Sequence, residues 1–206
     1  MRRILDLARE FGLWIIADEI YGRFVYETGP NAGAAPAPSF RDVMDAQDRV
    51  LFVQTFSKNW AMTGWRMGWL EAPVELGQII ENLIQYSSSG TPVFHQRAGV
   101  AALDQGETFL ADQIARARRG REIVGRLSET GRVALPPPAG AFYAFLRVIG
   151  ARDSRDVAIR LIDEANVGLA PGSAFGAGGE GHLRLCFARK AEDLDEAVRR
   201  LSRALA

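Results

Sequence analysis

Lys58 is the residue of this 206-residue sequence whose type and setting point most directly to chemistry. It is one of two lysines among 25 basic residues, and no other charged residue lies between Val50 and Trp65. An amine becomes a nucleophile only after it loses its proton, which lysine can do when partly desolvated and arginine cannot. The ordinary alternative is a solvated loop lysine. A lysine in an uncharged stretch of an arginine-rich sequence is consistent with an amine that forms a Schiff base.

Asp18 is the second candidate, with Tyr21 close behind it. Asp18 directly follows the apolar run Leu13–Ala17, and open α/β sheets bind ligands beyond the carboxyl ends of their strands. A carboxylate there could keep a pyridine nitrogen protonated, so that the ring accepts electrons from a substrate. A helix cap or loop carboxylate is the alternative. The phenol of Tyr21, three residues on, could reach the same ligand.

Thr55, Ser57 and Arg66 supply the groups that bind a phosphate. Two hydroxyls precede the lysine and a guanidinium follows it by eight residues. Phosphate oxygens accept hydrogen bonds from hydroxyls and from the planar fork of arginine. Taken singly each residue is weak support, because hydroxyls are common in loops and arginines usually face solvent.

These residues need a sheet and helices to position them. Apolar spacing predicts a helix from Met1 to Phe11, which ends at Gly12. Short apolar runs predict strands that are buried on both faces. The elements expected in the first half are strands at Leu13–Ala17, Val50–Val53 and Arg66–Leu70, a loop at Thr28–Ser39 and a helix at Val74–Tyr86.

The second half has a different pattern. A helical stretch from Val93 to Glu129 is too long for one globular helix, and we expect it to break near Gly106. Beyond the rigid loop Pro136–Pro138, strand and helix patterns alternate. The expected elements are a strand at Ala141–Val148, a helix at Asp156–Glu164, a strand at Leu183–Phe187 and a helix at Glu192–Leu205.

The pattern therefore predicts an α/β protein in three parts. Residues 1–95 form part of a large three-layer α/β domain, 96–129 a connecting helical segment, and 130–206 a small α+β domain. Buried parallel strands need neighbours on both sides, and the first half offers only about three. The opening helix likewise needs a larger sheet beneath it. We therefore expect that part of the large domain is absent from this sequence.

Composition excludes several classes of protein. Formal net charge is zero, which gives no support for binding to nucleic acid or to an anionic membrane. No apolar run approaches the roughly 20 residues of a membrane span, and the amino terminus does not resemble a signal peptide. The single cysteine, Cys186, excludes an intrachain disulfide. These features predict a cytoplasmic protein.

Two further motifs are weak. The glycine-rich segment Gly176–Gly181 precedes a predicted strand rather than a helix, so we expect a turn and not a phosphate loop. His95 and His182 have no metal-ligand spacing to other ligand residues, and we expect no metal site.

Five segments together resemble the class I/II aminotransferases, pyridoxal-phosphate enzymes of fold type I. Their order and spacing agree along the whole chain. The lysine segment and the Gly-Trp-Arg after it are the most specific part. The five segments are Ala17–Tyr21, Thr55–Lys58, Met62–Trp69, Gly140–Tyr143 and Leu183–Leu185.

The resemblance implies a role for each candidate residue. Lys58 carries pyridoxal 5′-phosphate and moves the substrate proton. Asp18 pairs with the pyridine nitrogen, and Tyr21 donates a hydrogen bond to the ring oxygen. The remaining roles are phosphate binding by Thr55, Arg66 and Ser57, and binding of the substrate α-carboxylate by Arg184. Considered without the resemblance, Arg184 is an ordinary surface charge on a strand.

The resemblance covers only the carboxy-terminal half of the family pattern. The phosphate loop, the aromatic residue that stacks on the ring and an asparagine near the ring oxygen belong to the other half. We expect an aminotransferase truncated at its amino terminus, acting on an amino acid and a 2-oxo acid as a homodimer. The alternatives are C–S lysis or decarboxylation on the same scaffold, a regulatory module of a transcription factor, and an inactive remnant.

Overall fold

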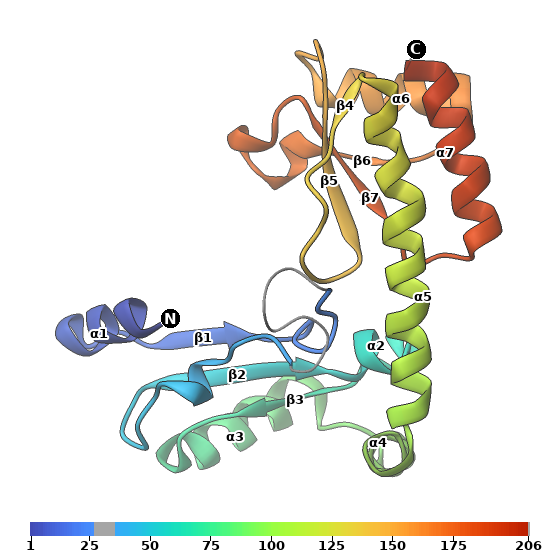
Figure 1. Cartoon of the computed structure of the whole chain (residues 1–206). Helices are drawn as coiled ribbons and strands as arrows, with labels where there is room; N and C mark the ends of the chain where they lie inside the picture. Colours follow the sequence, from blue (N-terminus) through green and yellow to red (C-terminus); the bar gives the residue numbers. More distant parts are fainter. Residues whose placement is uncertain (27–35, 206) are drawn as a thin grey trace. The chain divides into compact units, whose positions relative to one another are not determined.

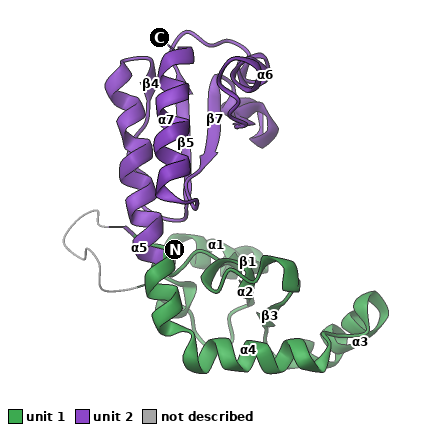
Figure 2. Ribbon diagram, turned by 90° about the vertical axis from the view of Figure 1, so that its right-hand side faces the viewer, with its two compact units in different colours: residues 1–25, 33–113 green, residues 26–32, 114–206 purple. Residues whose placement is uncertain are grey.

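The computed structural model describes residues 1–26 and 36–205. Contacts between Cα atoms divide the chain into two compact units (Figure 2). Unit 1 comprises residues 1–25 and 33–113, and unit 2 comprises residues 26–32 and 114–206. The division falls within helix α5 (Glu107–Gly125). The domain boundaries expected from the sequence, 1–95, 96–129 and 130–206, stay a prediction.

Unit 1 is built on a three-stranded sheet in the described part of the chain (Figure 1). Strand β1 (Ile15–Asp18) runs parallel to β2 (Val50–Thr55). Strand β3 (Gly68–Glu71) runs antiparallel on the other side of β2. All three strands overlap their predicted positions. Most of the predicted loop at Thr28–Ser39 lies outside the described residues.

Helix α1 (Arg2–Phe11) ends at Gly12, which adopts the left-handed conformation, as the sequence predicts. Its inward side chains are Leu5 and Ala8, and Leu5 packs with Ala17, Val50 and Phe52. This core covers one face of the sheet and ties α1 to β1 and β2.

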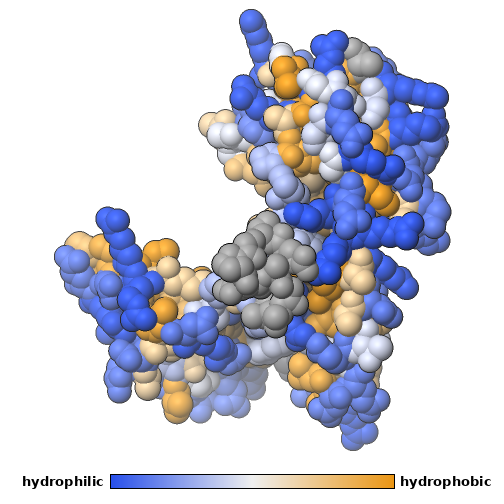
Figure 3. Space-filling model, viewed as in Figure 1, coloured by the Kyte–Doolittle hydropathy of each residue, from blue (hydrophilic) through white to orange (hydrophobic). Residues whose placement is uncertain are grey.

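The expectation that β1 is buried on both faces is wrong for this chain. Ala17 is buried, whereas the next residue toward the amino end, Ile16, is 69% exposed. Successive strand residues face opposite sides of a sheet, so only one face of β1 is covered. Ile4, Leu7 and Phe11 of α1 are also exposed, and Figure 3 shows apolar residues at the surface of α1.

Helices α3 (Gly77–Ser88) and α4 (Val93–Gln105) follow the sheet. Helix α3 has no buried residue, and several of its apolar side chains, such as Leu83, are exposed. The predicted break in the long helical stretch is confirmed, because α4 ends at Gln105 and α5 begins at Glu107.

Gly106 marks that break for a packing reason. A Cβ there would lie 2.3 Å from the carbonyl oxygen of Ala102 and 2.4 Å from Nε1 of Trp60. Both distances are far inside van der Waals contact, so only glycine lets the indole of Trp60 pack against the helix junction. The junction therefore packs on the residue that ends the segment carrying Lys58.

Unit 2 contains a four-stranded sheet of order β4-β5-β7-β6 among the described residues. The central strands β5 and β7 are antiparallel, with Phe145 opposite Arg184. Leu183, Leu185 and Phe187 are buried in alternation, as a half-buried strand requires. The strands are β4 (Val133–Ala134), β5 (Tyr143–Val148), β6 (Ala170–Pro171) and β7 (His182–Cys186).

Helices α6 (Ser154–Ala165) and α7 (Ala191–Leu205) pack against each other in unit 2. Asp153 caps α6 by accepting hydrogen bonds from the amides of Arg155 and Asp156. Leu161 of α6 and Leu201 of α7 are fully buried. The sequence predicted both helices and the two long strands. It missed β4 and β6, which have two residues each.

Candidate functional site

The carboxyl ends of β1 and β2 bring the first predicted site residues together. Asp18 is the last residue of β1 and pairs in register with Val53, two residues before Thr55. Its side chain is exposed, and its Oδ1 atom accepts a 3.4 Å hydrogen bond from the amide of Ile20. The Asp18 carboxylate therefore lies at the strand-end edge where α/β sheets bind ligands.

Thr55 turns β2 directly into the short helix α2 (Phe56–Asn59) that carries Lys58. Its hydroxyl accepts a 3.1 Å hydrogen bond from the amide of Ser57 and donates a 3.3 Å bond to the carbonyl of Met67. Ser57 itself is buried. Thr55 thus has a structural role as the helix cap, in addition to the phosphate contact that the sequence predicts.

Lys58 lies close to Tyr21. Its Nζ atom is 5.7 Å from the centroid of the Tyr21 ring, a distance at which an ammonium is attracted by the ring face. Within residues 1–26 and 36–205, no carboxylate lies within ion-pair distance of Nζ. The amine is therefore not committed to a salt bridge, and a ligand carbonyl or anion can approach it.

Arg66 follows a tight turn that doubles back toward the lysine. Its φ is 52° and its ψ is 48°, a left-handed conformation that costs a non-glycine residue on the order of 1 kcal/mol. Its Nη1 atom donates a 3.1 Å hydrogen bond to the carbonyl of Thr63. The Phe56 amide bonds to the carbonyl of Met67 at 3.2 Å, so this turn and the lysine helix are joined.

The groups at this edge fit pyridoxal 5′-phosphate. The amine of Lys58 suits an aldehyde, the carboxylate of Asp18 a protonated ring nitrogen, and the phenol of Tyr21 a ring oxygen. Hydroxyls and a guanidinium are the donors that a phosphate needs. The guanidinium of Arg66 is exposed and has no ion pair in the described part of the chain. Every one of these groups belongs to unit 1.

Arg184 belongs to unit 2, at the centre of β7. Its guanidinium carbon lies 4.5 Å from the centroid of the Tyr143 ring and 4.4 Å from that of Phe175. No described carboxylate lies within ion-pair distance of it. The arginine is thus held by aromatic rings, which leave its N–H groups available to an anion.

Tyr26 is a residue that sequence reasoning missed. It is 1% exposed, and its hydroxyl donates a 2.5 Å hydrogen bond to the carbonyl of Ala141. Its amide bonds to the carbonyl of Ala139 at 2.9 Å. Burial raises the pKa of the Tyr26 phenol. Tyr26 therefore fixes the start of the Gly140–Tyr143 segment, and nothing in its local sequence indicated this role.

Phe175 was also missed, because it directly precedes the segment Gly176–Gly181, for which the sequence predicts only a turn. Asn59 and Trp60 form another unexpected feature beside Lys58. Oδ1 of Asn59 and Nε1 of Trp60 are buried and have no hydrogen-bond partner among the described residues.

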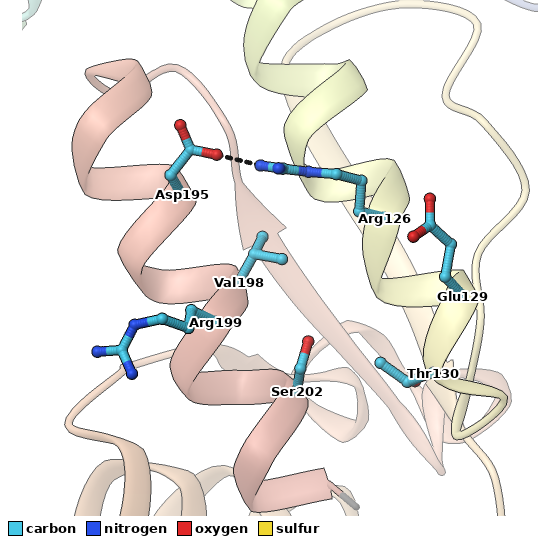
Figure 4. A pocket seen from close by; sticks show the side chains of 7 residues that line it. All are labelled: Arg126, Glu129, Thr130, Asp195, Val198, Arg199 and Ser202. Carbon is cyan, nitrogen blue, oxygen red and sulfur yellow. Dashed lines mark hydrogen bonds and ion pairs between the residues drawn. The ribbon is translucent and has the colours of Figure 1, made fainter.

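Two surface cavities lie away from the predicted site residues. One, of about 330 Å³, lies on unit 2 between α7 and the chain segment after α5, and Figure 4 shows its lining. Arg126 and Asp195 form an ion pair across it. The other, of about 430 Å³, lies on unit 1 beside α1. Neither contains a residue for which the sequence predicted a role.

Two other kinds of feature are absent from the described residues. No helix there has both the length and the apolar character to cross a membrane. No cluster of three or more histidine, cysteine, aspartate or glutamate side chains there could hold a metal ion.

Comparison with known proteins gives one consistent family. The family model "Aminotransferase class I and II" matches residues 1–201. An aspartate aminotransferase of Streptomyces avermitilis is 36% identical over 210 residues, covering 96% of this chain and 50% of that protein. One of Pyrococcus horikoshii is 32% identical over 208 residues, covering 99% of this chain and 51% of that protein.

Solved structures agree with this result. The aromatic aminotransferase of Pyrococcus horikoshii superposes with a TM-score of 0.87 at 33% identity, over 98% of this chain and 54% of that one. Aspartate aminotransferase of Thermotoga maritima gives 0.84 at 32% identity, over 97% and 50%. The predicted fold, part of pyridoxal-phosphate fold type I, is confirmed. The chain spans about half the length of the relatives it matches, and it belongs to the class I and II aminotransferase family.

Proposed function

We propose that this chain supplies the lysine and the substrate arginine of a pyridoxal-phosphate aminotransferase. The family's cofactor is pyridoxal 5′-phosphate, and its reaction moves an amino group between an amino acid and a 2-oxo acid. The observation that supports the proposal is the position of the Lys58 amine, 5.7 Å from the Tyr21 ring, just beyond the carboxyl ends of the paired strands β1 and β2. The bound cofactor supplies an aldehyde and an electron-accepting ring.

Each residue has a distinct task in this proposal. Lys58 holds the cofactor through its amine and moves a proton at the substrate Cα. Asp18 keeps the ring nitrogen protonated, which preserves the ring as an electron acceptor. Tyr21 donates a hydrogen bond from its phenol. Thr55, Ser57 and Arg66 bind the phosphate, and Arg184 binds the substrate α-carboxylate with its planar fork.

The setting of Lys58 suits these tasks. Its amine lies at the ring of Tyr21 and is free of a described carboxylate partner. An amine that is not held in an ion pair stays accessible to the aldehyde that the cofactor supplies. Helix α2 begins at the Thr55 cap, so the same short segment presents the amine and the phosphate donors.

Aminotransfer is favoured over the alternative pyridoxal-phosphate reactions by the relatives. Those reported above are named aspartate or aromatic aminotransferases. Their names cover two substrate classes, so we propose an amino acid aminotransferase without assigning its amino acid. A homodimer in the cytoplasm completes the proposal. The exposed apolar side chains of α3 and α4, including Leu83 and Phe94, support the dimer.

An assay of amino transfer tests the proposal. The chain is joined behind the amino-terminal half of the Streptomyces avermitilis relative, and the joined form is supplied with the cofactor and an amino acid. We expect 2-oxo acid to form. Lys58→Ala should lower the rate by at least roughly 1000-fold, because the nucleophile and the proton carrier are lost together.

The control is Lys190→Ala, which removes the other lysine. Lys190 is exposed at the start of α7, and its loss should leave the rate unchanged. Equal rates in the Lys58→Ala form and the parent form would contradict the proposed function.

A further inference from the structure

Arg184 lies in an aromatic setting that the sequence did not indicate. Its guanidinium carbon is 4.4 Å from the ring centroid of Phe175 and 4.5 Å from that of Tyr143. Each ring is within the range of a cation–π contact, which also limits where the guanidinium can move. Tyr143 begins β5, the neighbour of β7, so its ring reaches Arg184 across the sheet.

Phe175 reaches the arginine from a different element, the 3₁₀ turn Gly172–Phe175. This turn directly follows β6, whose Ala170 pairs in register with Arg184. The ring is 49% exposed. The ring is therefore not part of a buried core, and its contacts are with the Arg184 guanidinium and, edge-on at 6.0 Å, with the ring of Phe145.

The turn that carries Phe175 is firmly held. The amide of Ser173 donates a 3.1 Å hydrogen bond to the hydroxyl of Ser154, which is 1% exposed. The hydroxyl of Ser154 in turn lies 3.1 Å from that of Ser173. A Cβ on Gly172 would lie 2.0 Å from the carbonyl oxygen of Gly179, so the two backbone segments are in direct contact. Because the turn is held in place, the Phe175 ring offers the flexible Arg184 side chain a fixed surface to pack against.

We propose that Phe175 is a positioning residue for Arg184: its ring holds the guanidinium so that the fork is oriented before a carboxylate binds. The identity of that carboxylate rests on the proposed function. The positioning of the Arg184 guanidinium by Phe175 does not depend on it. A free arginine side chain loses rotamer freedom when it binds a ligand. A guanidinium already held by rings has less freedom to lose, and its planar fork stays available because no described carboxylate occupies it.

The test is made on the full chain with 15N-labelled arginine. The Arg184 Nε signal is identified by its loss in Arg184→Lys, and its heteronuclear NOE reports the mobility of the side chain. Propionate is the carboxylate probe. Phe175→Leu should lower the NOE and weaken propionate binding by about 3- to 10-fold, the effect expected for one newly mobile side chain. Phe175→Tyr restores a ring and should restore both values.

Phe145→Leu is the matched control. Phe145 lies opposite Arg184 in register, but its ring stacks on His182 at 4.9 Å and meets the edge of the Phe175 ring at 6.0 Å, without a cation–π contact to the guanidinium. This variant should leave the Arg184 signal and the propionate affinity within twofold of the parent chain. The thermal midpoint should be similar in all forms, because both rings are exposed. An unchanged NOE and affinity in Phe175→Leu would overturn the proposal, as would a failure of Phe175→Tyr to restore both values.

Failure of this test is distinguishable from failure of the proposed function. A cofactor adduct on Lys58 bears on the function alone, and it involves no residue of the Arg184 cluster. The mobility of the Arg184 side chain is measured without cofactor, substrate or turnover.

Discussion

Lys58 and Arg184 are two of the cations on which the proposed function depends, and each has an aromatic ring as its neighbour. Tyr21 lies beside the amine, and Tyr143 and Phe175 lie beside the guanidinium. Elsewhere in the chain, arginines form ion pairs with carboxylates, as Arg9 does with Asp48. An aromatic neighbour does not occupy the N–H groups of a cation as a carboxylate does, so both side chains remain accessible to a ligand.

Replacing Arg184 tests whether its geometry matters beyond its charge. In the joined form, Arg184→Lys should raise the Michaelis constants for the amino acid and the 2-oxo acid alike by about 10- to 100-fold. The reason is that a single ammonium cannot reproduce two parallel charge-assisted hydrogen bonds. Steady-state kinetics with both substrates measures the effect. Unchanged constants for both would show that Arg184 does not bind the α-carboxylate.

How far the sequence predicted the site depends on the residue. Lys58, Asp18 and Tyr21 follow from residue type and placement after apolar strands, because strand order brings their backbone positions to one edge. The contact of Phe175 with Arg184 could not be predicted in this way. It arises from a two-residue strand and a short turn that have no periodicity to detect. Tyr26 was missed for a different reason, because the partner of its hydroxyl, Ala141, lies more than 100 residues away in the sequence.

At the scale of elements, α1 is held in unit 1 by its apolar core and also by an ion pair between Arg9 and Asp48, which we call the clasp. Arg9 donates hydrogen bonds of 2.7 and 2.6 Å to the two oxygens of Asp48, and Asp48 also accepts a 2.7 Å bond from the amide of Asp45. The Arg9 guanidinium, together with the Asp45 amide, lowers the pKa of the buried Asp48 carboxyl. The clasp therefore joins the helix to the loop before β2.

This clasp predicts a pH-dependent loss of stability. The pKa of Asp48 is lower in the folded chain than in the unfolded chain, where it is about 3.9. Its contribution is fully present above that value and disappears as the pH falls through the lower, folded pKa. Asp48→Asn should reduce the free energy of unfolding at pH 7 by about 1–2 kcal/mol, and the difference should shrink below about pH 4.

Urea denaturation at a series of pH values measures this difference. Asp45→Asn is the control, because the Asp45 side chain is 73% exposed and its pair with Arg9 contributes little. A loss for Asp48→Asn no larger than that for Asp45→Asn would show that the clasp has no energetic role.

The junction between α4 and α5 allows a second test at this scale. Gly106→Ala places a Cβ against the Ala102 carbonyl and the Trp60 indole, and this overpacking should destabilise the chain by about 1–3 kcal/mol. Gly125→Ala is the control, since nothing lies within 4 Å of a Cβ there. Chemical denaturation of both variants decides the matter. Equal midpoints would mean that the junction repacks without cost.

The sequence located this junction but not its cause. A helical pattern too long for one helix predicts a break, and glycine is the residue that most readily provides it. The contact with Trp60 joins residues far apart in the sequence, so only the structure reveals it. The predicted apolar stripe of α1 illustrates the opposite case. The periodicity predicted the helix correctly. It does not predict which other element covers each apolar side chain, and in this structure Ile4 and Phe11 remain exposed.

At the scale of the whole molecule, the chain contains half of the family's length and a sheet with one bare face. Ile16 of β1 and Leu70 of β3 are exposed, as are apolar residues of α3. The resemblance implies that the phosphate loop and the ring-stacking residue lie in the half of the family pattern that this chain does not cover. Under the proposed function, this chain supplies only part of the set of groups that hold the cofactor.

The chain alone should therefore bind pyridoxal 5′-phosphate weakly. We expect a dissociation constant at least roughly 100-fold higher than that of the joined form, since several charge-assisted phosphate contacts are missing. Fluorescence or absorbance titration of both forms measures the ratio. Full aminotransferase turnover by the 206-residue chain alone would contradict this view of the molecule.

The most direct test of the central claim is to find which residue bonds to the cofactor. The joined form is mixed with pyridoxal 5′-phosphate, reduced with borohydride to fix the bond, digested and mapped by mass spectrometry. We predict that the pyridoxyl label falls on Lys58, persists in Lys190→Ala and is absent from Lys58→Ala and Lys58→Arg, because a guanidinium stays protonated. A label on Lys190, or on neither lysine, would contradict the assignment of Lys58 and the function built on it.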